Sequence, residues 1–550
     1  VNDLIQTFGV RYAKGAEYLR ALTALEKPFF EARAAQSDDT AIERLGDEVR
    51  RYAAVSREAL LANPMLNFDK VLVVRRNYGN SARAIIGGSL GLPGGNSWTN
   101  DDIRHTGWDN QIAVLSNLRG DAKLTKFYEP DGSKIVIDVD LDFDASRVMF
   151  SSIGSSDRWR LFETKADGSG LRQITPDLPD VDHFDSCYLP DGRIAFASTA
   201  AYQAMPCING GAPMAQLYTC DNSGKNIRQI TFEQDSDWTP AVHHNGRLLY
   251  LRWEYTDTPH YFTRLLFHSN PDGSGQMEYF HSNSYFPNCY FYARAIPGHP
   301  TEVVGIATGH HGIPRSGRMI LFDPARGRQD ADGAVQEIPG YGRKVEVKIK
   351  DPLIEGVWPQ FLQPYPLADY ADPRNPMGGG KYFLVAMKRD EHSLWGIYLV
   401  DKFDNFTLLK EVEGAALIEP IPFQAVPRPP VIPDRAVPGK KEATVYLSDI
   451  YTGPGLKGIP RGKVKNLRLF SYHFNYNHTG GHASVGIQSG WDIKRILGTV
   501  PVEADGSASF KIPANTTVTL QPLDENGRAL QLMRSWFTGV PGEVVSCVGC

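Results

Sequence analysis

The spacing of hydrophobic positions along this chain changes after about 60 residues. Before that point, apolar residues recur every three or four positions through YLRALTALEKPFFEARAA and AIERLGDEVRRYAAVSREALLA, with charged residues between them. This spacing predicts amphipathic helices. From FDKVLVVRR onward, the apolar stretches are short and are separated by turn residues, which is typical of strands. We therefore expect a helical segment at residues 1–66 and a mostly β protein after it.

Three stretches in the middle of the chain repeat the same order of a turn, an arginine and a short apolar strand. They are FDASRVMFSS, LPDGRIAFAS and HHNGRLLYLR, which contain Arg147, Arg193 and Arg247. Each leads to a second strand and a polar turn such as ADGSG, in which Asp-Gly supplies the positive φ of a hairpin. Repeats of about 40–55 residues that hold several short strands are typical of a β-propeller. Weaker copies bring the expected number of blades to between five and seven, and our estimate is six.

The repeats and the changes in composition divide the chain into five parts. After the helical segment we expect a strand and loop region at 67–130, which is a candidate part of the first blade, and the β-propeller at 131–424. The proline-rich stretch AVPRPPVIPDRAVPGKK at 425–441 predicts a linker. Residues 442–550 alternate apolar and polar positions and carry Asp-Gly and Asn-Gly hairpin signals. They predict a small antiparallel β-sandwich-like domain.

Composition excludes some classes of protein. The 550 residues are 42% hydrophobic and 22% charged, with a net charge of −5, so nothing predicts binding to nucleic acid. No apolar run is long enough for a membrane span. The chain starts without the basic and apolar stretches of a secretory signal, so composition by itself allows either a cytoplasmic chain or a mature exported one.

The chain ends on GEVVSCVGC, in which Cys547 and Cys550 form a C-x-x-C pair. Pairs with this spacing occur in redox dithiols, in zinc sites and in haem attachment motifs, where a histidine follows the second cysteine. No βαβ pattern of a dithiol oxidoreductase surrounds Cys547. Outside this pair, the nearest cysteine in the sequence is Cys289, so no second pair for a zinc site is nearby. These observations favour a truncated haem-attachment motif whose axial histidine would be residue 551. A redox pair, a zinc site and an incidental pair stay open.

Other polar residues are weak candidates for a catalytic site at the mouth of the propeller. His310 and His311 are adjacent in the glycine-rich stretch TGHHGIPRSG, and neutral imidazole is a common metal ligand and proton carrier. Arg252, Asp257 and His260 lie in RWEYTDTPHYF, which we expect to be a long loop between strands.

Four aspartates alternate with apolar residues in DVDLDFD, namely Asp138, Asp140, Asp142 and Asp144. In a strand, residues at this spacing share one face. A calcium-binding EF-hand loop would need glycine and glutamate where Phe143 and Met149 stand. We therefore expect this face to line a channel or to meet solvent rather than to bind a cation.

Several longer stretches resemble the family of the hydrazine synthase alpha subunit. They run over residues 70–550 and include FYARAIPGHPTEVVGIATGHHGIPRSG, RILGTVPVEADGSASFKIPANT and LQLMRSWFTGVPGEVVSCVGC. The resemblance implies an N-terminal domain, a six-bladed propeller with TolB-like repeats and a C-terminal region that carries haem c on Cys547 and Cys550. It also implies a periplasmic or secreted protein, because c-type haem is attached outside the cytoplasm, and a redox partner or other subunits.

The resemblance further implies a zinc ion, for which Asp140, Cys289, His310 and His311 are only candidates. We do not infer hydrazine synthesis itself. Our first hypothesis is an exported c-type cytochrome-like protein with a haem-based redox or electron-transfer role on a propeller scaffold. The alternative is a non-catalytic propeller that binds a glycan or a protein partner. A third is a propeller hydrolase or lyase that uses the histidines with Arg252.

Overall fold

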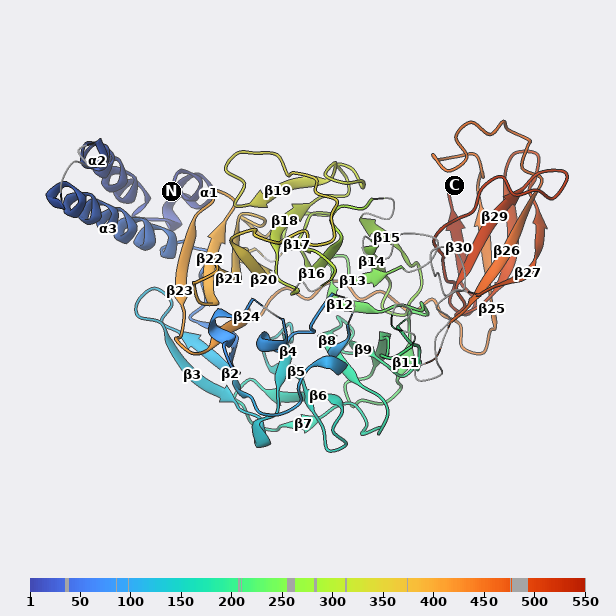
Figure 1. The fold of residues 1–550 in the computed structure, drawn as a ribbon, viewed down its shortest axis with the longest axis horizontal. Helices are drawn as coiled ribbons and strands as arrows, with labels where there is room; N and C mark the ends of the chain where they lie inside the picture. Colours follow the sequence, from blue (N-terminus) through green and yellow to red (C-terminus); the bar gives the residue numbers. More distant parts are fainter. Residues whose placement is uncertain are drawn as a thin grey trace.

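The structure is a computed structural model, and it describes residues 1–34, 39–85, 87–96, 98–205, 208, 210–254, 263–280, 284–311, 314–372, 374–474, 476 and 493–549. Figure 1 shows a helical hairpin at the N-terminal end, a ring of sheets in the centre and two small sheets at the C-terminal end. The prediction of a mostly β protein behind an N-terminal helical segment is confirmed.

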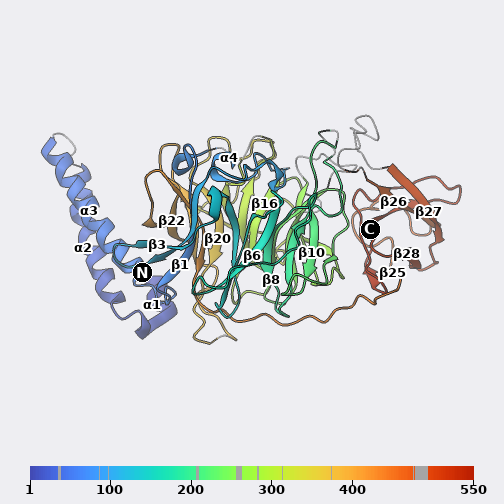
Figure 2. The same cartoon turned by 90° about the horizontal axis from the view of Figure 1, so that it is seen from below.

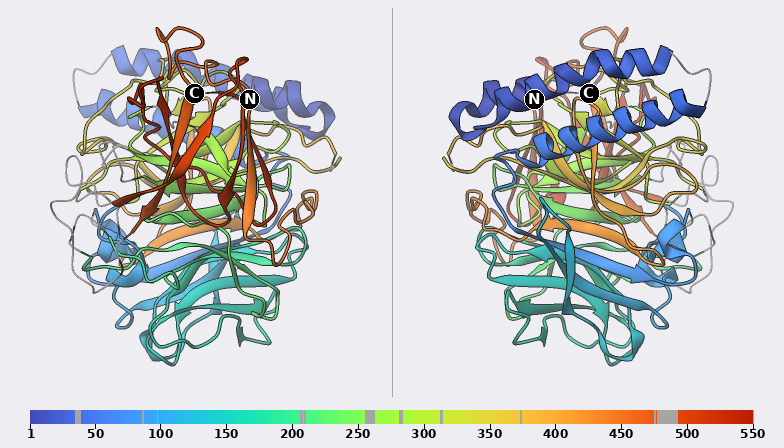
Figure 3. Two further views of the ribbon diagram at one scale, coloured as in Figure 1. Left: turned by 90° about the vertical axis from the view of Figure 1, so that its right-hand side faces the viewer. Right: turned by 90° about the vertical axis from the view of Figure 1, so that its left-hand side faces the viewer.

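The N-terminal helices project from the ring of sheets. The α-helices are α1 (Asn2–Phe8), α2 (Gly15–Ala34), α3 (Asp39–Leu61) and the single turn α4 (Gly87–Leu90). Short 3-10 turns lie at Gly9–Arg11, Ser81–Arg83, Asn100–Asp102 and Asp131–Ser133. Figure 3 shows α2 and α3 side by side, while Leu4 and Phe8 of α1 are buried in the same core as Tyr382 of the sheets. No helix in the described ranges is long and apolar enough to cross a membrane.

The described residues form six four-stranded antiparallel sheets that follow one another around a ring (Figure 1). The first five along the chain contain β4 (Val136–Leu141), β5 (Arg147–Ile153), β6 (Trp159–Lys165) and β7 (Arg172–Gln173); β8 (His183–Tyr188), β9 (Ile194–Ser198), β10 (Gln216–Cys220) and β11 (Arg228–Gln229); β12 (Asp237–Val242), β13 (Leu248–Trp253), β14 (Arg264–Ser269) and β15 (Met277–Phe280); β16 (Cys289–Ala295), β17 (Val303–Thr308), β18 (Arg318–Phe322) and β19 (Ala334–Ile338); and β20 (Gln360–Pro366), β21 (Tyr382–Lys388), β22 (Gly396–Asp401) and β23 (Phe406–Lys410).

The sixth sheet closes the ring by joining the two ends of this region. Its innermost strand is β24 (Ala416–Pro422), which pairs with β1 (Lys70–Asn77), and β2 (Asp109–Ser116) and β3 (Lys123–Tyr128) continue outward. The innermost strands β24, β4, β8, β12, β16 and β20 contact one another in that order, and β20 returns to β24. This is the arrangement of a six-bladed β-propeller, in agreement with our estimate of six.

A repeated turn explains how neighbouring blades fit together. Gly224 between β10 and β11 has φ +76°, and a Cβ there would lie 1.8 Å from the carbonyl oxygen of Ile174 in the preceding blade. Gly273 between β14 and β15 stands in the same relation to Ile230, at 2.5 Å. The isoleucine of the RQIT motif in one blade therefore contacts the glycine of the Asp-Gly or Ser-Gly turn in the next blade.

The proline-rich stretch at 425–441 contains no helix or strand, and it runs across one face of the propeller rather than away from it (Figure 2). The backbone N–H of Val426 donates to the carbonyl of Phe143 at 2.9 Å, and Asp434 accepts from Arg193 at 2.7 Å. Further along, the N–H groups of Arg435 and Ala436 both donate to the carboxylate of Asp272. The linker therefore contacts three consecutive blades before it reaches the C-terminal sheets.

The C-terminal sheets form a small sandwich with its own apolar core. One sheet contains β28 (Ala508–Pro513), β25 (Glu442–Leu447) and β30 (Val544–Cys547), and the other contains β27 (Ile493–Pro501), β26 (Asn466–His473) and β29 (Val518–Leu523). We expected antiparallel pairing throughout, but β30 runs parallel to β25. The chain crosses to this edge after β29 without a hairpin, and a connection of that kind permits parallel pairing.

We expect Gly224→Ala to lower the free energy of unfolding of the propeller by at least about 2 kcal/mol, because the new methyl group meets a carbonyl oxygen and the backbone conformation is left-handed. Gly192 is the matched control, because its φ is +89° but a Cβ there would meet open space. Gly192→Ala should cost about 1 kcal/mol. Urea denaturation followed by fluorescence measures both values, and equal losses would contradict the proposed contact between blades.

Candidate functional sites

Each innermost strand carries one residue in the left-handed region, at the same place in every blade. We call these six residues the axial ring: Asp138, Asp185, Thr239, Tyr292, Gln363 and Glu419, with φ between +47° and +56°. Each lies at a shift in the pairing register, which marks a β-bulge. Non-glycine residues with positive φ are uncommon, so their recurrence at six equivalent places is a feature of the fold and not an accident.

Side chains of the axial ring hold the backbone of neighbouring blades. The N–H of Asp185 donates to Oδ2 of Asp138 at 3.0 Å, and the N–H of Thr239 donates to Oδ2 of Asp185 at 2.5 Å. Glu419 accepts from the N–H of Val139 at 2.8 Å and donates its own N–H to Gln363 at 3.2 Å. These bonds connect adjacent blades at four of the six places where two innermost strands meet around the axis.

The carboxyl groups of the axial ring are difficult to ionise. Burial and, to a smaller extent, the neighbouring Asp138 raise the pKa of Asp185 to about 7. Burial likewise raises the pKa of Glu419 to about 7, against an opposing effect of the Arg76 guanidinium. The pKa of Asp138 is also raised by burial. Asp185 and Glu419 of the ring therefore titrate near neutral pH.

A cavity of about 780 Å³ lies on the propeller axis between this ring and the linker. Its wall includes Asp140 of β4 and Asp142 just after it, Cys187 of β8, Arg294 of β16 and Tyr365 of β20. Burial raises the pKa of Asp140 to about 6, while Arg294 opposes that shift. Our expectation that the alternating aspartates line a channel holds for Asp138, Asp140 and Asp142. They do not share one strand face throughout, because the bulge at Asp138 breaks the alternation.

Cys289, His310 and His311 gather at the other end of the innermost strands. The Cys289 thiol donates to the carbonyl of Gly309 at 3.2 Å, and burial raises its pKa to about 12. The ring centres of His310 and His311 lie 3.9 Å apart. His311 is exposed, with Nδ1 2.7 Å from Asp351 Oδ2, but His310 is only 1% exposed. Of the two histidines that we named as candidates for a site at the propeller mouth, His310 is therefore buried, and it packs near the Trp253 ring.

The zinc candidates are thus divided between two places, because Asp140 lines the axial cavity whereas Cys289 begins β16. Asp351 completes the polar group around the histidines, and the sequence offered no motif that identifies it. Among the described residues, no group of three or more histidine, cysteine, aspartate or glutamate side chains is placed to hold a metal ion. Asp257 and His260 lie outside the described residues.

Arg252 is part of a buried contact between the propeller and the sandwich, not of a loop as we expected. Its guanidinium carbon lies 4.3 Å from the Phe267 ring centre and 4.6 Å from that of Trp536, and we call these three residues the arginine clamp. Glu233 and Glu254 lie 3.4 and 2.9 Å from its nitrogens. With its side chain 1% exposed, Arg252 neutralises buried carboxylates and has no access to a substrate in solution.

Cys547 ends the edge strand β30 of the sandwich. Its thiol is in no disulfide bond and is partly buried against the sandwich core, which raises its pKa. Val544 and Val548 on either side are 66% and 71% exposed. A reactive dithiol needs a lowered thiol pKa, so this setting disfavours the redox-dithiol alternative. Cys550 lies outside the described residues.

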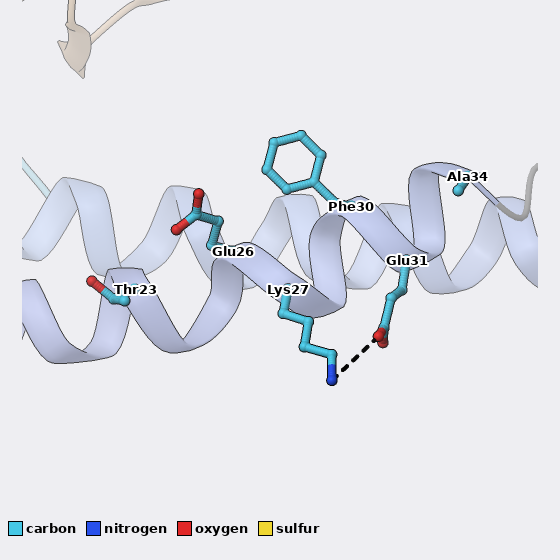
Figure 4. A pocket seen from close by; sticks show the side chains of 6 residues that line it. All are labelled: Thr23, Glu26, Lys27, Phe30, Glu31 and Ala34. Atoms are coloured by element: carbon cyan, nitrogen blue, oxygen red, sulfur yellow. Dashed lines mark ion pairs between the residues drawn. The ribbon is translucent and has the colours of Figure 1, made fainter.

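A further hollow lies along the exposed surface of α2 (Figure 4). Its lining residues come from this one helix and include Phe30 and the ion pair of Lys27 with Glu31, whose nitrogen and oxygen are 3.7 Å apart. It brings together no group that the sequence analysis selected.

Together these features define a six-bladed β-propeller with a docked C-terminal β-sandwich that ends in a cysteine-bearing strand. Residues 462–550 match the family model described as the hydrazine synthase alpha subunit middle domain. The fold is similar to Kuenenia stuttgartiensis hydrazine synthase, with a TM-score of 0.66 and 15% identity over 88% of this chain and 69% of that one. The family model therefore supports the resemblance to a hydrazine synthase alpha-like family that we inferred from the sequence over residues 462–550, and the likeness of the rest of the chain is one of fold.

Other solved structures are less similar. TolB from Acinetobacter baumannii aligns with a TM-score of 0.35 and 9% identity over 68% of this chain and 72% of its own. Oligogalacturonate lyase from Vibrio parahaemolyticus aligns with a TM-score of 0.31 and 13% identity over 53% of this chain and 72% of its own. No curated protein sequence matches this chain significantly.

We expect Asp185 to make the free energy of unfolding fall as pH rises from about 5 to about 7. Between its ordinary value of 3.8 and its raised value of about 7, Asp185 holds a proton in the folded state that the unfolded state has released. The native state then binds more protons, so raising the pH destabilises it. Asp185→Asn should flatten this slope, because the amide oxygen still accepts from Thr239. Asp221→Asn, at an exposed turn with a lowered pKa, should leave the slope unchanged. Urea denaturation at several pH values measures it, and an unchanged slope in Asp185→Asn would contradict the assignment.

We expect Arg252→Ala to lower the free energy of unfolding by about 3–5 kcal/mol, because it leaves Glu233 and Glu254 buried without a cation. Arg461→Ala is the control, because the ion pair of Arg461 with Asp449 is exposed and should contribute about 1 kcal/mol or less. Chemical denaturation measures both variants. A loss in Arg252→Ala no larger than in the control would show that Arg252 is not structural.

Proposed function

We propose that this chain is the scaffold of an exported c-type cytochrome-like protein, in which Cys547 and Cys550 hold a covalent haem. The observation that carries the proposal is the C-x-x-C pair itself, which lies at the end of the segment matching the hydrazine synthase alpha middle domain. On this proposal the protein is periplasmic or secreted, and other subunits or a redox partner exchange electrons with it.

The residues around Cys547 are compatible with haem attachment. Thioether bonds form when each cysteine S–H adds across a vinyl group of the haem, so the thiol must not be oxidised, and Cys547 is in no disulfide. The position on an edge strand leaves room beside it, and the exposed Val544 and Val548 offer apolar surface to a porphyrin. A haem held there would supply one-electron chemistry.

The propeller and the sandwich would provide a fixed platform for this group. Ser535 of the sandwich donates to Glu254 at 2.7 Å, and Glu543 accepts from the N–H of Gly275 at 2.7 Å, in addition to the arginine clamp. Electron transfer and ligand binding at a haem both depend on a fixed orientation and on the local dielectric. The docked sandwich would supply both at the C-terminal strand.

The test is to produce the full-length gene product in a host that matures c-type cytochromes and to record a pyridine haemochrome spectrum of the denatured protein. We expect a covalent haem signal in the wild type and its loss in the Cys547→Ser, Cys550→Ser double variant. Cys220→Ser, which changes a buried cysteine of a propeller strand, is the matched control and should keep the signal. A folded wild-type protein without covalent haem in a competent host would refute the proposal.

A further inference from the structure

The axial cavity contains a charged side chain whose charge no neighbour balances directly. Arg294 lies in β16, and its guanidinium carbon is 5.1 Å from the centre of the Tyr365 ring. Within the described part of the chain, no residue accepts a hydrogen bond from this guanidinium or forms an ion pair with it. Asp140 interacts with the Arg294 guanidinium through their opposite charges, but at a distance too long for a hydrogen bond or an ion pair. A guanidinium carries five N–H donors, and a half-buried one without partners favours an acceptor from outside the protein.

Uncharged donors and acceptors line the same cavity as Arg294. Tyr292, Tyr365 and Tyr370 line the cavity, and none of their hydroxyl groups bonds to another residue in the described ranges. Ser186 also lines it, is 8% exposed, and has a hydroxyl oxygen without a partner among these residues. Such groups match the hydroxyls of a polar ligand better than they match an apolar molecule.

The cavity is large enough for a small molecule and is connected to solvent. Its volume of about 780 Å³ lies within the range of about 300–1,000 Å³ that is typical of ligand sites. One part of its wall is made by Pro427, Pro429 and Pro430 of the linker. Another part includes His299 and Arg374, whose side chains are 39% and 94% exposed, so the cavity reaches the surface there.

We propose that the axial cavity binds a small hydroxylated carboxylate of the size of a sugar acid. The carboxylate would pair with Arg294, whose planar fork matches two carboxylate oxygens, and the hydroxyls would bond the tyrosines and the free oxygen atoms of the aspartates. A metal ion is a poorer occupant, because the described residues offer no group of three ligands placed to hold one. A simple ammonium ion is also poorer, because it would leave Arg294 unpaired.

The test is calorimetric titration of the purified full-length protein with glucuronate and gluconate, next to methyl glucoside as a neutral sugar and alanine as a zwitterion. We expect binding of at least one sugar acid and no measurable binding of methyl glucoside or alanine. Arg294→Ala should weaken that binding at least tenfold, which corresponds to the loss of one charged hydrogen-bond pair. Arg461→Ala is the matched control, because Arg461 pairs with Asp449 on the surface of the sandwich and does not line this cavity. It should change the affinity less than threefold.

Folding does not confound this comparison, because the guanidinium of Arg294 has only the Tyr365 ring as a direct partner among the described residues. Circular dichroism and the thermal midpoint verify that point, and Arg294→Lys gives a second variant that keeps the charge but loses the fork. Absence of binding by both sugar acids would overturn the proposal. So would an affinity unchanged in a folded Arg294→Ala, or tighter binding of alanine or methyl glucoside. Failure of this test would leave the haem proposal standing, because Cys547 does not line the cavity.

Discussion

The crowding of six strands around one axis is the constraint on which the rest of this structure depends. Where the innermost strands meet, each has a bulge and a residue with positive φ. At four places around the axis, a side chain of this axial ring accepts a hydrogen bond from a backbone N–H of an adjacent blade. The left-handed conformation costs about 1–2 kcal/mol at each residue, so the fold keeps it only because these contacts compensate. The sheet that joins β24 to β1 takes part through Glu419, so ring closure and the axial network depend on the same residue.

Two groups of buried carboxyl side chains in the propeller have their negative charge compensated in different ways. This difference distinguishes a structural contact from a candidate ligand site. In the arginine clamp, Arg252 sits directly between Glu233 and Glu254, so charge and partner are matched within the protein. On the axis, the carboxyls are stabilised mainly by backbone N–H groups and by protonation, and Arg294 has no direct acceptor among the residues that the structure describes. A matched ion pair explains why a domain stays docked. An unmatched cation beside unpaired hydroxyls in a cavity is a feature that a ligand would complete.

The sequence predicted elements where the pattern is local and failed where distant residues decide the outcome. The Asp-Gly and Ser-Gly turns made the repeated blades visible in the sequence, because each of these turns needs a residue with positive φ. The bulge at Asp138 was hidden, because DVDLDFD alternates as a regular strand would, and the crowding at the axis is a tertiary effect. Arg252 looked like a loop residue until Trp536, nearly 300 positions later in the chain, covered it. His310 lies in a glycine-rich loop, yet its side chain is buried beside the Trp253 ring at the end of β13.

The two proposed activities occupy different parts of the molecule, and the contacts between those parts determine how they relate. Cys547 lies on an edge strand of the sandwich, and the axial cavity lies inside the propeller, with the blade of β12–β15 and its arginine clamp between them. The linker contacts both regions, because Pro430 lines the cavity and the backbone N–H of Val437 donates to Pro541 just before β30. A ligand that changes the position of the linker would therefore have a direct mechanical route to the cysteine strand. Coupling between two sites acts in both directions, so haem attachment at Cys547 of β30 would in turn change the affinity of the cavity for its ligand.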